Sequence, residues 1–450
     1  MAERHKVLIL GGGFGGLVAA QSLKRAPVDV TLIDRRNFHL FQPLMYQVAT
    51  GSLSPGDIAA PLRGVLSKQK NTQVLLGEAV DIDPAAKQVT LRDGGVFPYD
   101  SLIVATGSQT SYYGNDGWRE WAPSLKSIEE ATDIRHKILY AFEEAERAAT
   151  PEQVRAWLTF VIVGAGATGM ELAGALAEIA NETLRHDFRH INPPDARILL
   201  MEGGPRVLPA YPEVLSAKAE KLVTRLGVEV VKNVMVTDIN ADGVAFRRGD
   251  AIEHLAAKTV LWAGGIITTA FGKRLAERTQ AETDRTGRIT VKPDLTVPNY
   301  PDIFIVGDLA HALAESGNPL PGVAQVAIQG GAYAAKAIRA RVEGKQPLKP
   351  FHYFNKGDMA VIGRAAAVAN IFGLHISGLL AWLIWLFIHL IYIVEFQSRV
   401  MVFIQWGFEY LTFSRGARLI TGTAATDVLG PGKPLSCTAT AAGDTREDHG

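Results

Sequence analysis

Three glycines near the start of the chain, Gly11, Gly13 and Gly16, have the spacing of a phosphate-binding turn. They follow the apolar run 7–10 and precede residues 17–24, which have helical spacing, so they lie where a strand turns into a helix. In this setting the first glycine permits a tight turn, the second lets the backbone approach a pyrophosphate, and the third lets strand and helix pack closely. The stretch predicts a dinucleotide site rather than a glycine-rich turn without a ligand.

Asp34 ends the next apolar run, residues 28–33, where it can accept hydrogen bonds from a ribose. The segment that follows, residues 35–49, is rich in aromatic and amide side chains and has no clear period. It can line a site for a flat apolar ligand or form an ordinary packed connection, and its composition does not separate the two.

The opening pattern returns at Gly164, Gly166 and Gly169, after the apolar run 157–163 and before a helical stretch at 170–179. This is a second complete nucleotide-binding unit. Two such units in one chain suggest two different dinucleotides.

Glu202 ends the strand predicted at 197–201. A carboxylate there accepts hydrogen bonds from a free ribose 2′-hydroxyl and repels a 2′-phosphate, so Glu202 favours NADH over NADPH. Its distance from Gly169 exceeds the usual separation of about 20 residues, which a polar insertion at 181–196 explains. A solvated charge at a strand end is the alternative.

Three further strands end in small residues, which let the backbone pass close to a cofactor. These ends are Ala105, Thr106 and Gly107, then Gly264, and then the glycine before Asp308. A carboxylate that returns so late in the chain suits the ribityl hydroxyls or the pyrophosphate region of a bound FAD.

Three polar side chains on predicted helices are candidates for chemistry. Glu171 follows Gly169 by two residues, near a helix N-terminus that favours a carboxylate through the helix dipole alone. Gln325 and Gln329 share one face of the helix that starts at Ala324. Without further context, such glutamines are most often surface polar groups.

Composition excludes several classes of protein. Lys and Arg together number 46, as do Asp and Glu, so there is no global electrostatic case for nucleic acid. The single cysteine, Cys437, excludes a disulfide scaffold, a cysteine-ligated metal site and C-x-x-C chemistry. No metal-ligand cluster or nucleophilic triad is evident, and the polar residues 1–6 leave no room for a signal peptide.

A run of 19 residues without formal charge, 376–394, is long enough to be a transmembrane candidate. His375, Gly378, Trp382, Trp385, His389, Tyr392 and Arg399 recur mostly at three and four residues, and residues 401–413 repeat the amphipathic pattern. We expect an interfacial anchor with its apolar face in the bilayer; a single span and a buried dimer interface remain open. Arg399, Arg415 and Arg418 flank the helices and could meet anionic head groups.

The fold class predicted is α/β, with two Rossmann-like dinucleotide-binding domains and a C-terminal amphipathic-helix membrane anchor. A chain of 450 residues has room for this organisation. A charged amphipathic helix at 124–149 is expected to link the domains. We predict an FAD-binding domain at 1–120 and 271–345, an NADH-binding domain at 121–270, the anchor at 346–420 and a disordered tail at 421–450.

The combined motifs resemble the type II, non-proton-pumping NADH:quinone oxidoreductases, which are flavoproteins related to glutathione reductase. The resemblance covers roughly residues 5–420. Its most specific elements are the Ala-Gln-Val-Ala-Ile-Gln segment at 324–329 and the Trp-rich C-terminal region that ends in Arg-Gly-Ala-Arg at 415–418. Asp34 departs from the glutamate common at its position, and residues beyond 421 lie outside the resemblance.

The resemblance implies that FAD occupies the first unit, with Asp34 and Asp308, and that NADH binds the second unit through Glu202. It places Glu171 near the flavin, where it could relay protons, and Gln325 and Gln329 at the head group of a membrane quinone. The cofactor-binding residues expected on this basis are Gly11, Gly13, Phe14, Gly16, Asp34, Arg35, Val80, Ala105, Thr106, Gly107, Gly164, Gly166, Gly169, Glu202, Gly264, Asp308, Ala324 and Gln325.

The implied activity is transfer of two electrons from NADH through non-covalent FAD to quinone, without proton pumping. The implied setting is the cytoplasmic face of the cell membrane, on anionic lipid, as a homodimer formed through the C-terminal region. A sulfide:quinone oxidoreductase would need redox cysteines, which this chain lacks. A soluble ferredoxin or rubredoxin reductase and a flavin-bound NADH sensor remain alternatives.

Overall fold

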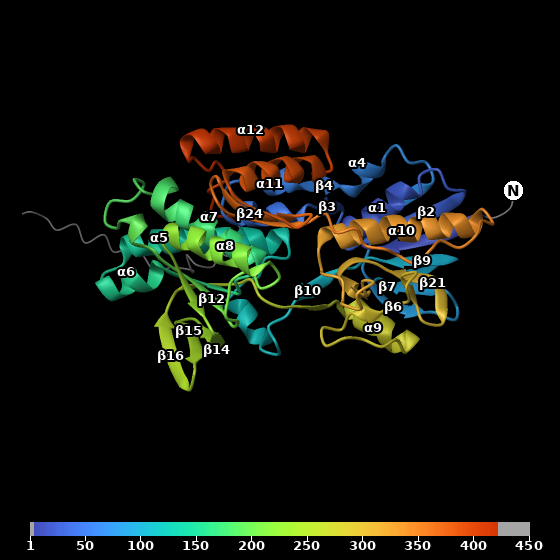
Figure 1. The fold of residues 1–450 in the computed structure, drawn as a ribbon, viewed down its shortest axis with the longest axis horizontal. Coiled ribbons are helices and arrows are strands. Elements are labelled where there is room, and N and C mark those ends of the chain that lie inside the picture. Colours follow the sequence, from blue (N-terminus) through green and yellow to red (C-terminus); the bar gives the residue numbers. More distant parts are fainter. Residues whose placement is uncertain (1–3, 422–450) are drawn as a thin grey trace, which may run out of the picture.

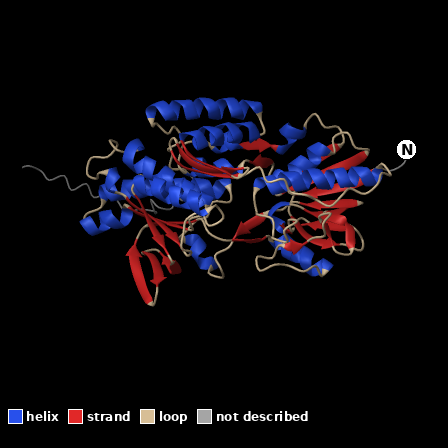
Figure 2. Cartoon of the chain, viewed as in Figure 1, coloured by secondary structure: helices blue, strands red, loops and turns tan. Residues whose placement is uncertain are grey.

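The computed structural model describes residues 4–421, so the expected tail and Cys437 lie outside the described residues. Two α/β halves lie side by side, and a pair of C-terminal helices covers them along one edge (Figure 1). Each half is built on its own mainly parallel sheet with helices on it (Figure 2).

The sheet of the first half has six strands. Four of its strands come from residues before 110 and two return from near residue 300, and five of the six run parallel. In spatial order they are β20 (Thr296–Val297), β21 (Tyr300–Ile305), β9 (Ser101–Val104), β1 (His5–Leu10), β2 (Val28–Asp34) and β5 (Thr72–Leu76). Residues from both ends of the 5–305 stretch therefore build one sheet, with β21 parallel to β9.

Both faces of this sheet are covered, which explains why its central strands are apolar without alternation. Val7 and Ile9 of β1 pack under α1 (Phe14–Ser22) and α10 (Ala324–Val342). Leu8 and Leu10 point to the opposite face, toward α9 (Ala270–Thr279). A small antiparallel sheet also lies on that face, formed by β6 (Ala79–Asp83), β7 (Gln88–Leu91) and β8 (Val96–Pro98).

The second half repeats the design on a four-stranded parallel sheet. Its strands are β13 (Val228–Lys232), β12 (Arg197–Glu202), β11 (Thr159–Val163) and β17 (Thr259–Trp262). Three helices pack in the larger core beside it: α5 (Ile128–Arg147), α7 (Ala167–Glu178) and α8 (Glu213–Arg225). The opposite face carries the antiparallel sheet of β14 (Val234–Asn240), β15 (Gly243–Arg248) and β16 (Ala251–Ala256).

An antiparallel pair, β10 (Ser108–Thr110) and β18 (Ile266–Thr268), joins the two halves where the chain crosses between them. The helix expected at 124–149 begins later, at Ile128, because the Ser127 side chain caps it by accepting from the Glu130 N–H. Its buried residues pack against α2 (Met45–Ala49) and β11, so it is part of a core as well as a connection. The domain boundaries predicted above stay a prediction.

The C-terminal region begins with a sheet that the sequence analysis missed: β23 (Asp358–Gly363), β24 (Ala366–Ile371) and β25 (Leu374–Gly378). It packs on α7, where a Cβ at Gly174 would lie 1.7 Å from the Ile362 carbonyl oxygen. The helical stripe predicted from His375 and Gly378 is therefore wrong at its start, because both residues belong to β25.

Two helices follow, α11 (Leu379–Tyr392) on the sheet and α12 (Phe396–Thr412) outside it (Figure 1). Their inner side buries Trp385 and Trp406, whereas large apolar side chains face outward. The most exposed of these are Leu379, Leu380, Phe387, Phe396, Phe403, Ile404, Phe408 and Leu411. Within residues 4–421, no helix has the combined length and apolarity needed to cross a membrane.

The expected contact of the flanking arginines with lipid head groups is wrong for Arg415. Its side chain is buried, and its guanidinium forms an ion pair with Glu178 at 2.9 Å. Arg418 pairs with Asp187 at 2.6 Å, and Arg399 donates to the Ile393 carbonyl oxygen. All three arginines bind the protein itself.

Candidate active site

A cavity of about 890 Å³ opens at the carboxyl ends of β1, β2, β9 and β21. Most of the residues predicted for the first nucleotide unit line it. They are Gly11, Gly13, Phe14, Asp34, Arg35, Val80, Ala105, Thr106, Gly107, Asp308 and Ala324, together with Glu171 from the second half. The parallel strands bring these distant segments to one edge of the sheet, as expected for a doubly wound fold.

The first glycine motif has the backbone geometry that its spacing predicts. Gly11 has φ +100°, which favours glycine, and its N–H donates to the Ile33 carbonyl oxygen at 2.8 Å. A Cβ on Gly16 would lie only 1.8 Å from the Gly11 carbonyl oxygen, so Gly16 is required for the contact of strand and helix and does not line the cavity. A Cβ on Gly13 would meet nothing within 4 Å, so Gly13 leaves space at the helix N-terminus.

Asp34 is held on both of its carboxylate oxygens. Oδ2 accepts from the Gly12 N–H at 2.5 Å and Oδ1 accepts from the Arg36 N–H at 2.7 Å. Burial raises its pKa, and these two backbone hydrogen bonds oppose that rise. The carboxylate therefore fixes the glycine turn as well as facing the cavity.

His39 is a residue that sequence reasoning missed, although it lies in the aromatic segment 35–49. Its Nδ1 donates to the Gly12 carbonyl oxygen at 2.9 Å, and burial lowers its pKa, which favours the neutral ring. Nε2 is buried without a hydrogen-bond partner among the described residues. Phe14 packs edge-on against the ring at a centroid distance of 5.1 Å.

Asp308 reaches the same cavity from the short helix η5 (Gly307–Leu309). The Ser108 hydroxyl donates to its Oδ2 at 2.8 Å, and Lys126 Nζ lies 4.0 Å from the same oxygen. The carboxylate is thus positioned from β10 and from the segment before α5.

The second glycine motif has nearly the same backbone geometry as the first. Gly164 has φ +102°, a Cβ on Gly169 would lie 1.9 Å from the Gly164 carbonyl oxygen, and a Cβ on Gly166 would meet nothing within 4 Å. Gly264 follows β17 beside this turn, and its N lies 3.0 Å from where a Cβ on Gly164 would stand.

Glu202 plays the part that Asp34 has in the first unit. Its Oε2 accepts from the Ala165 N–H at 2.8 Å and its Oε1 accepts from the Gly204 N–H at 2.9 Å. Ala165 and Gly12 are both the second residue of their glycine motifs. The late carboxylate therefore reaches the expected position despite the insertion before β12, which contains a π-helix, η3 (Ile179–Thr183), and a short 3-10 helix, η4 (Pro193–Asp195).

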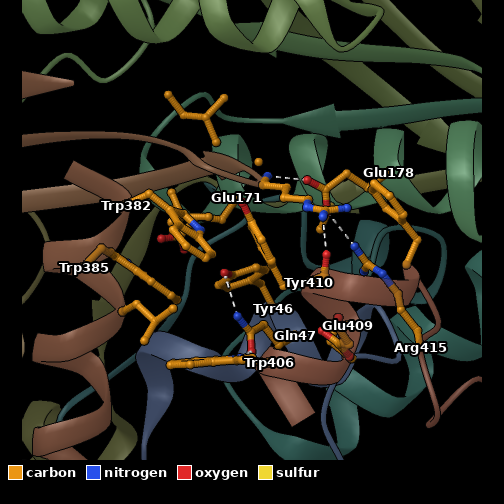
Figure 3. Close-up of a pocket in the computed structure, with 18 of the residues that line it drawn as sticks. Tyr46, Gln47, Glu171, Glu178, Trp382, Trp385, Trp406, Glu409, Tyr410 and Arg415 are labelled. Atoms are coloured by element: carbon orange, nitrogen blue, oxygen red, sulfur yellow. Dashed lines mark hydrogen bonds and ion pairs between the residues drawn. The ribbon is translucent and has the colours of Figure 1, made fainter. Parts of the chain in front are cut away.

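A smaller cavity of about 100 Å³ lies between α7, β23 and the C-terminal helices (Figure 3). Tyr46 and Glu171 line both this cavity and the large one. The carboxyl of Glu171 is enclosed by protein apart from the cavities, and this desolvation raises its pKa to about 8, although the Val361 backbone N–H donates to it. Near neutral pH, Glu171 is therefore mainly protonated.

Gln325 and Gln329 do not line either cavity. Gln329 exchanges two hydrogen bonds of 2.9 Å with the Phe354 backbone, so its amide ties α10 to the segment before β23. Gln325 donates to the Gly357 carbonyl oxygen at 3.1 Å, and its Oε1 is buried without a partner in residues 4–421.

Family models match nearly all of the described chain. Residues 5–331 match the model described as pyridine nucleotide-disulphide oxidoreductase, and residues 355–415 match the NDH2 C-terminal domain. The type II NADH:quinone oxidoreductase Ndh of Mycobacterium tuberculosis is 46% identical over 429 residues, which span 94% of this chain and 92% of that protein. The chain belongs to the type II NADH:quinone oxidoreductases.

More distant members share the same extent. The type II NADH:quinone oxidoreductase of Staphylococcus saprophyticus is 30% identical over 84% of this chain and 92% of its own length. The structure of NDH2 from Plasmodium falciparum in complex with NADH has a TM-score of 0.83 at 20% identity and covers 93% of this chain and 100% of that chain. At that identity the match shows the fold, here over both halves and the C-terminal region.

Proposed function

We propose that this type II NADH:quinone oxidoreductase passes two electrons from NADH, through FAD in the 890 Å³ cavity, to a membrane quinone without pumping protons. One observation carries the proposal. The chain has two glycine turns of matching geometry, each fastened by a carboxylate, and the first lines a large cavity that also reaches Glu171.

The residues of the large cavity fit FAD. The space in front of Gly13 is open, as a pyrophosphate requires. Asp34 would hold the ribose, and Asp308 would hold the ribityl or pyrophosphate region. When bound, FAD supplies an isoalloxazine ring that accepts a hydride from NADH and returns electrons in pairs to quinone.

The second unit is assigned to NADH. The open space at Gly166 admits the pyrophosphate, and Glu202 offers its carboxylate to the adenosine ribose while it holds the turn through Ala165. A 2′-phosphate would bring negative charge against this carboxylate, so NADH is preferred over NADPH.

For quinone, two groups of this chain are the best candidates. Glu171 can deliver a proton from its Oε atoms at the wall of the large cavity. Gln325 has a buried, unpartnered Oε1 on the first turn of α10, one residue after Ala324 of the cavity wall. Gln329 is occupied by the Phe354 backbone, so we assign it to positioning of that segment.

The outward apolar side chains of α11 and α12 support a monotopic attachment to the cytoplasmic face of the cell membrane, through the anionic lipid surface. Soluble proteins rarely expose so many large apolar residues on neighbouring helices. The same surface supports a homodimer through the C-terminal region.

The electron-transfer proposal is tested with the purified yellow protein under anaerobic conditions. NADH should bleach the flavin absorbance, and a short-chain quinone should restore it. Bleaching without reoxidation by quinone would favour a carrier-protein reductase or an NADH sensor, and a protein that binds no flavin would refute the assignment of the large cavity.

The attachment to lipid is tested by flotation with anionic vesicles. Phe403→Ser combined with Leu411→Ser should weaken binding, because these side chains are 58% and 79% exposed on α12. Ile252→Ser is the control, since Ile252 is 60% exposed on β16, which packs against the second half. Equal flotation of the α12 variant and the wild type would contradict the proposal.

A further inference from the structure

The smaller cavity joins two carboxyl groups from different parts of the chain. Glu171 comes from α7, at the wall of the large cavity, and Glu409 comes from α12, the outer C-terminal helix (Figure 3). The cavity of about 100 Å³ has room for several water molecules, and its polar lining offers them hydrogen-bond partners. Tyr46 lines both cavities, as Glu171 does.

We propose that this cavity is the proton pathway for quinone reduction, in which Glu409 takes up a proton on the α12 side and Glu171 delivers it to the large cavity. The proposal rests on the proposed function and adds a source for the proton. Tyr46 lines the cavity that the two carboxyl groups share, and water in this cavity would bridge them, so no direct contact between them is needed.

The charged surroundings of Glu409 suit a group that both gains and loses a proton. Burial raises its pKa to about 7, while Arg415 and a hydrogen bond from Ser52 oppose the rise and Glu178 adds to it. Arg415 is shared, because its guanidinium already pairs with Glu178 at 2.9 Å. Arg364 also faces this region, with its guanidinium 4.2 Å from the centroid of the Tyr410 ring.

Glu171 is suited to the delivering end. Two tyrosines feel its charge, which raises the pKa of Tyr46 and of Tyr211. No arginine or lysine is among the groups that shift the pKa of Glu171, which is about 8. Burial raises the pKa of both Glu171 and Glu409 towards neutral pH, so each carboxyl group can hold and release a proton near neutral pH.

The stoichiometry of the reaction requires a source for one proton. NADH and quinone react with one proton to give NAD⁺ and quinol, so NADH supplies a hydride and one proton comes from water in each turnover. The outer faces of α11 and α12 are apolar and offer this proton no route, whereas the small cavity behind them has a polar lining that includes Glu409. Glu409 is the one carboxylate within α12.

The test compares Glu409→Gln, which cannot release a proton, with Glu182→Gln as the control. Glu182 is an exposed carboxylate on η3, next to Thr183 of the cavity wall, and Glu182→Gln makes the same chemical replacement outside the cavity. In Glu409→Gln, reoxidation of the flavin by quinone should slow on the order of tenfold, with the wild-type dependence of kcat on pH near 7 lost. KM for quinone should be unchanged, and Glu182→Gln should behave as the wild type.

A second readout does not depend on turnover. Three of the seven tryptophans, Trp382, Trp385 and Trp406, line the same cavity as Glu409. Their fluorescence in the holoenzyme should change as pH passes about 7. Glu409→Gln should remove this component and leave any change due to Glu171 near pH 8, whereas Glu182→Gln should titrate as the wild type does.

The proposal is overturned if Glu409→Gln reoxidises at the wild-type rate across pH, or if its fluorescence titrates as the wild type does. If the glutamine variant does not retain flavin, Glu409→Asp carries the test: a slower reoxidation with a shifted pH profile supports the pathway, and an unchanged profile overturns it. A wild-type protein that does not reduce quinone at all would instead refute the proposed function.

Discussion

The variants Gly13→Ala and Gly166→Ala should change the binding of the two dinucleotides without reducing the stability of the fold. Gly13 has φ −69° and ψ −165°, Gly166 has φ −70° and ψ −174°, and a Cβ on either meets no protein atom within 4 Å. Alanine adopts this conformation without strain, so each variant should be as stable as the wild type or more stable by about 0.4–1 kcal/mol. The added methyl group projects into the space that a pyrophosphate needs.

The expected cost in binding follows from overpacking. A methyl group forced against a closely held ligand costs about 1–3 kcal/mol of binding free energy, which raises the dissociation constant roughly 5- to 150-fold. Gly13→Ala should lose affinity for FAD, and Gly166→Ala should lose affinity for NADH while it keeps its flavin. Gly16→Ala is a structural comparison, because its Cβ would lie 1.8 Å from the Gly11 carbonyl oxygen and should destabilise the fold itself.

The assay measures three quantities for each variant: the flavin content after purification, the dissociation constant of added FAD, and the dissociation constant of NADH from bleaching of the bound flavin. Thermal unfolding of flavin-free protein gives the stability. If Gly13→Ala binds FAD as the wild type does while Gly166→Ala loses it, the assignment of the two units is reversed. If both bind normally, neither glycine turn holds a pyrophosphate.

Three further predictions follow from buried or fastened charges. Glu202→Ala should weaken NADH binding by about tenfold and raise the relative use of NADPH in steady-state kinetics; Glu229→Ala, an exposed carboxylate on β13, should change neither. Folding raises the pKa of Glu171 from 4.5 to about 8, so its contribution to stability is complete below pH 4.5 and is lost as pH rises through 8. In Glu171→Gln the free energy of unfolding, measured with denaturant, should therefore depend less on pH between these values. An unchanged pH dependence would count against an enclosed carboxyl group. Arg415→Ala should cost about 3 kcal/mol because it leaves Glu178 without its ion-pair partner, whereas Arg418→Ala, which breaks a more exposed pair, should cost less than about 1 kcal/mol by chemical denaturation.

The nucleotide units were predictable from sequence because their chemistry is local. A glycine turn depends on residues within six positions of one another and on the strand before it, so Gly11 and Gly164 reach the predicted conformation directly. The position of Glu202 was predictable for the same reason. The parallel sheet places the end of its strand beside the glycine turn, whatever the length of the insertion before that strand.

The secondary structure of the C-terminal region could not be predicted in this way. The structure divides the run 376–394 between β25 and α11, because β24 offers β25 a partner strand whose paired residues lie 3 to 11 positions earlier in the chain. Composition alone does not reveal that partner, since residues 366–371 are mainly alanine and valine. Pairing with β24 makes residues 374–378 a strand, although their spacing also fits a helix.

The same limit explains why Arg415 and Glu409 were misread or left out. An arginine after an apolar helix is typical of a head-group contact when its surroundings are unknown, and only the tertiary fold brings Glu178 to within 2.9 Å of it. That ion pair links α7, which carries Glu171, to the segment that follows α12, the helix of Glu409. The C-terminal helices therefore do more than present an apolar face, because through Arg415 they complete the wall of the cavity that adjoins the flavin site. A deletion from Leu374 onward would remove this wall and expose the cavity. Point substitutions on the outer face of α12 leave the wall in place, so they test attachment to the membrane separately from electron and proton transfer.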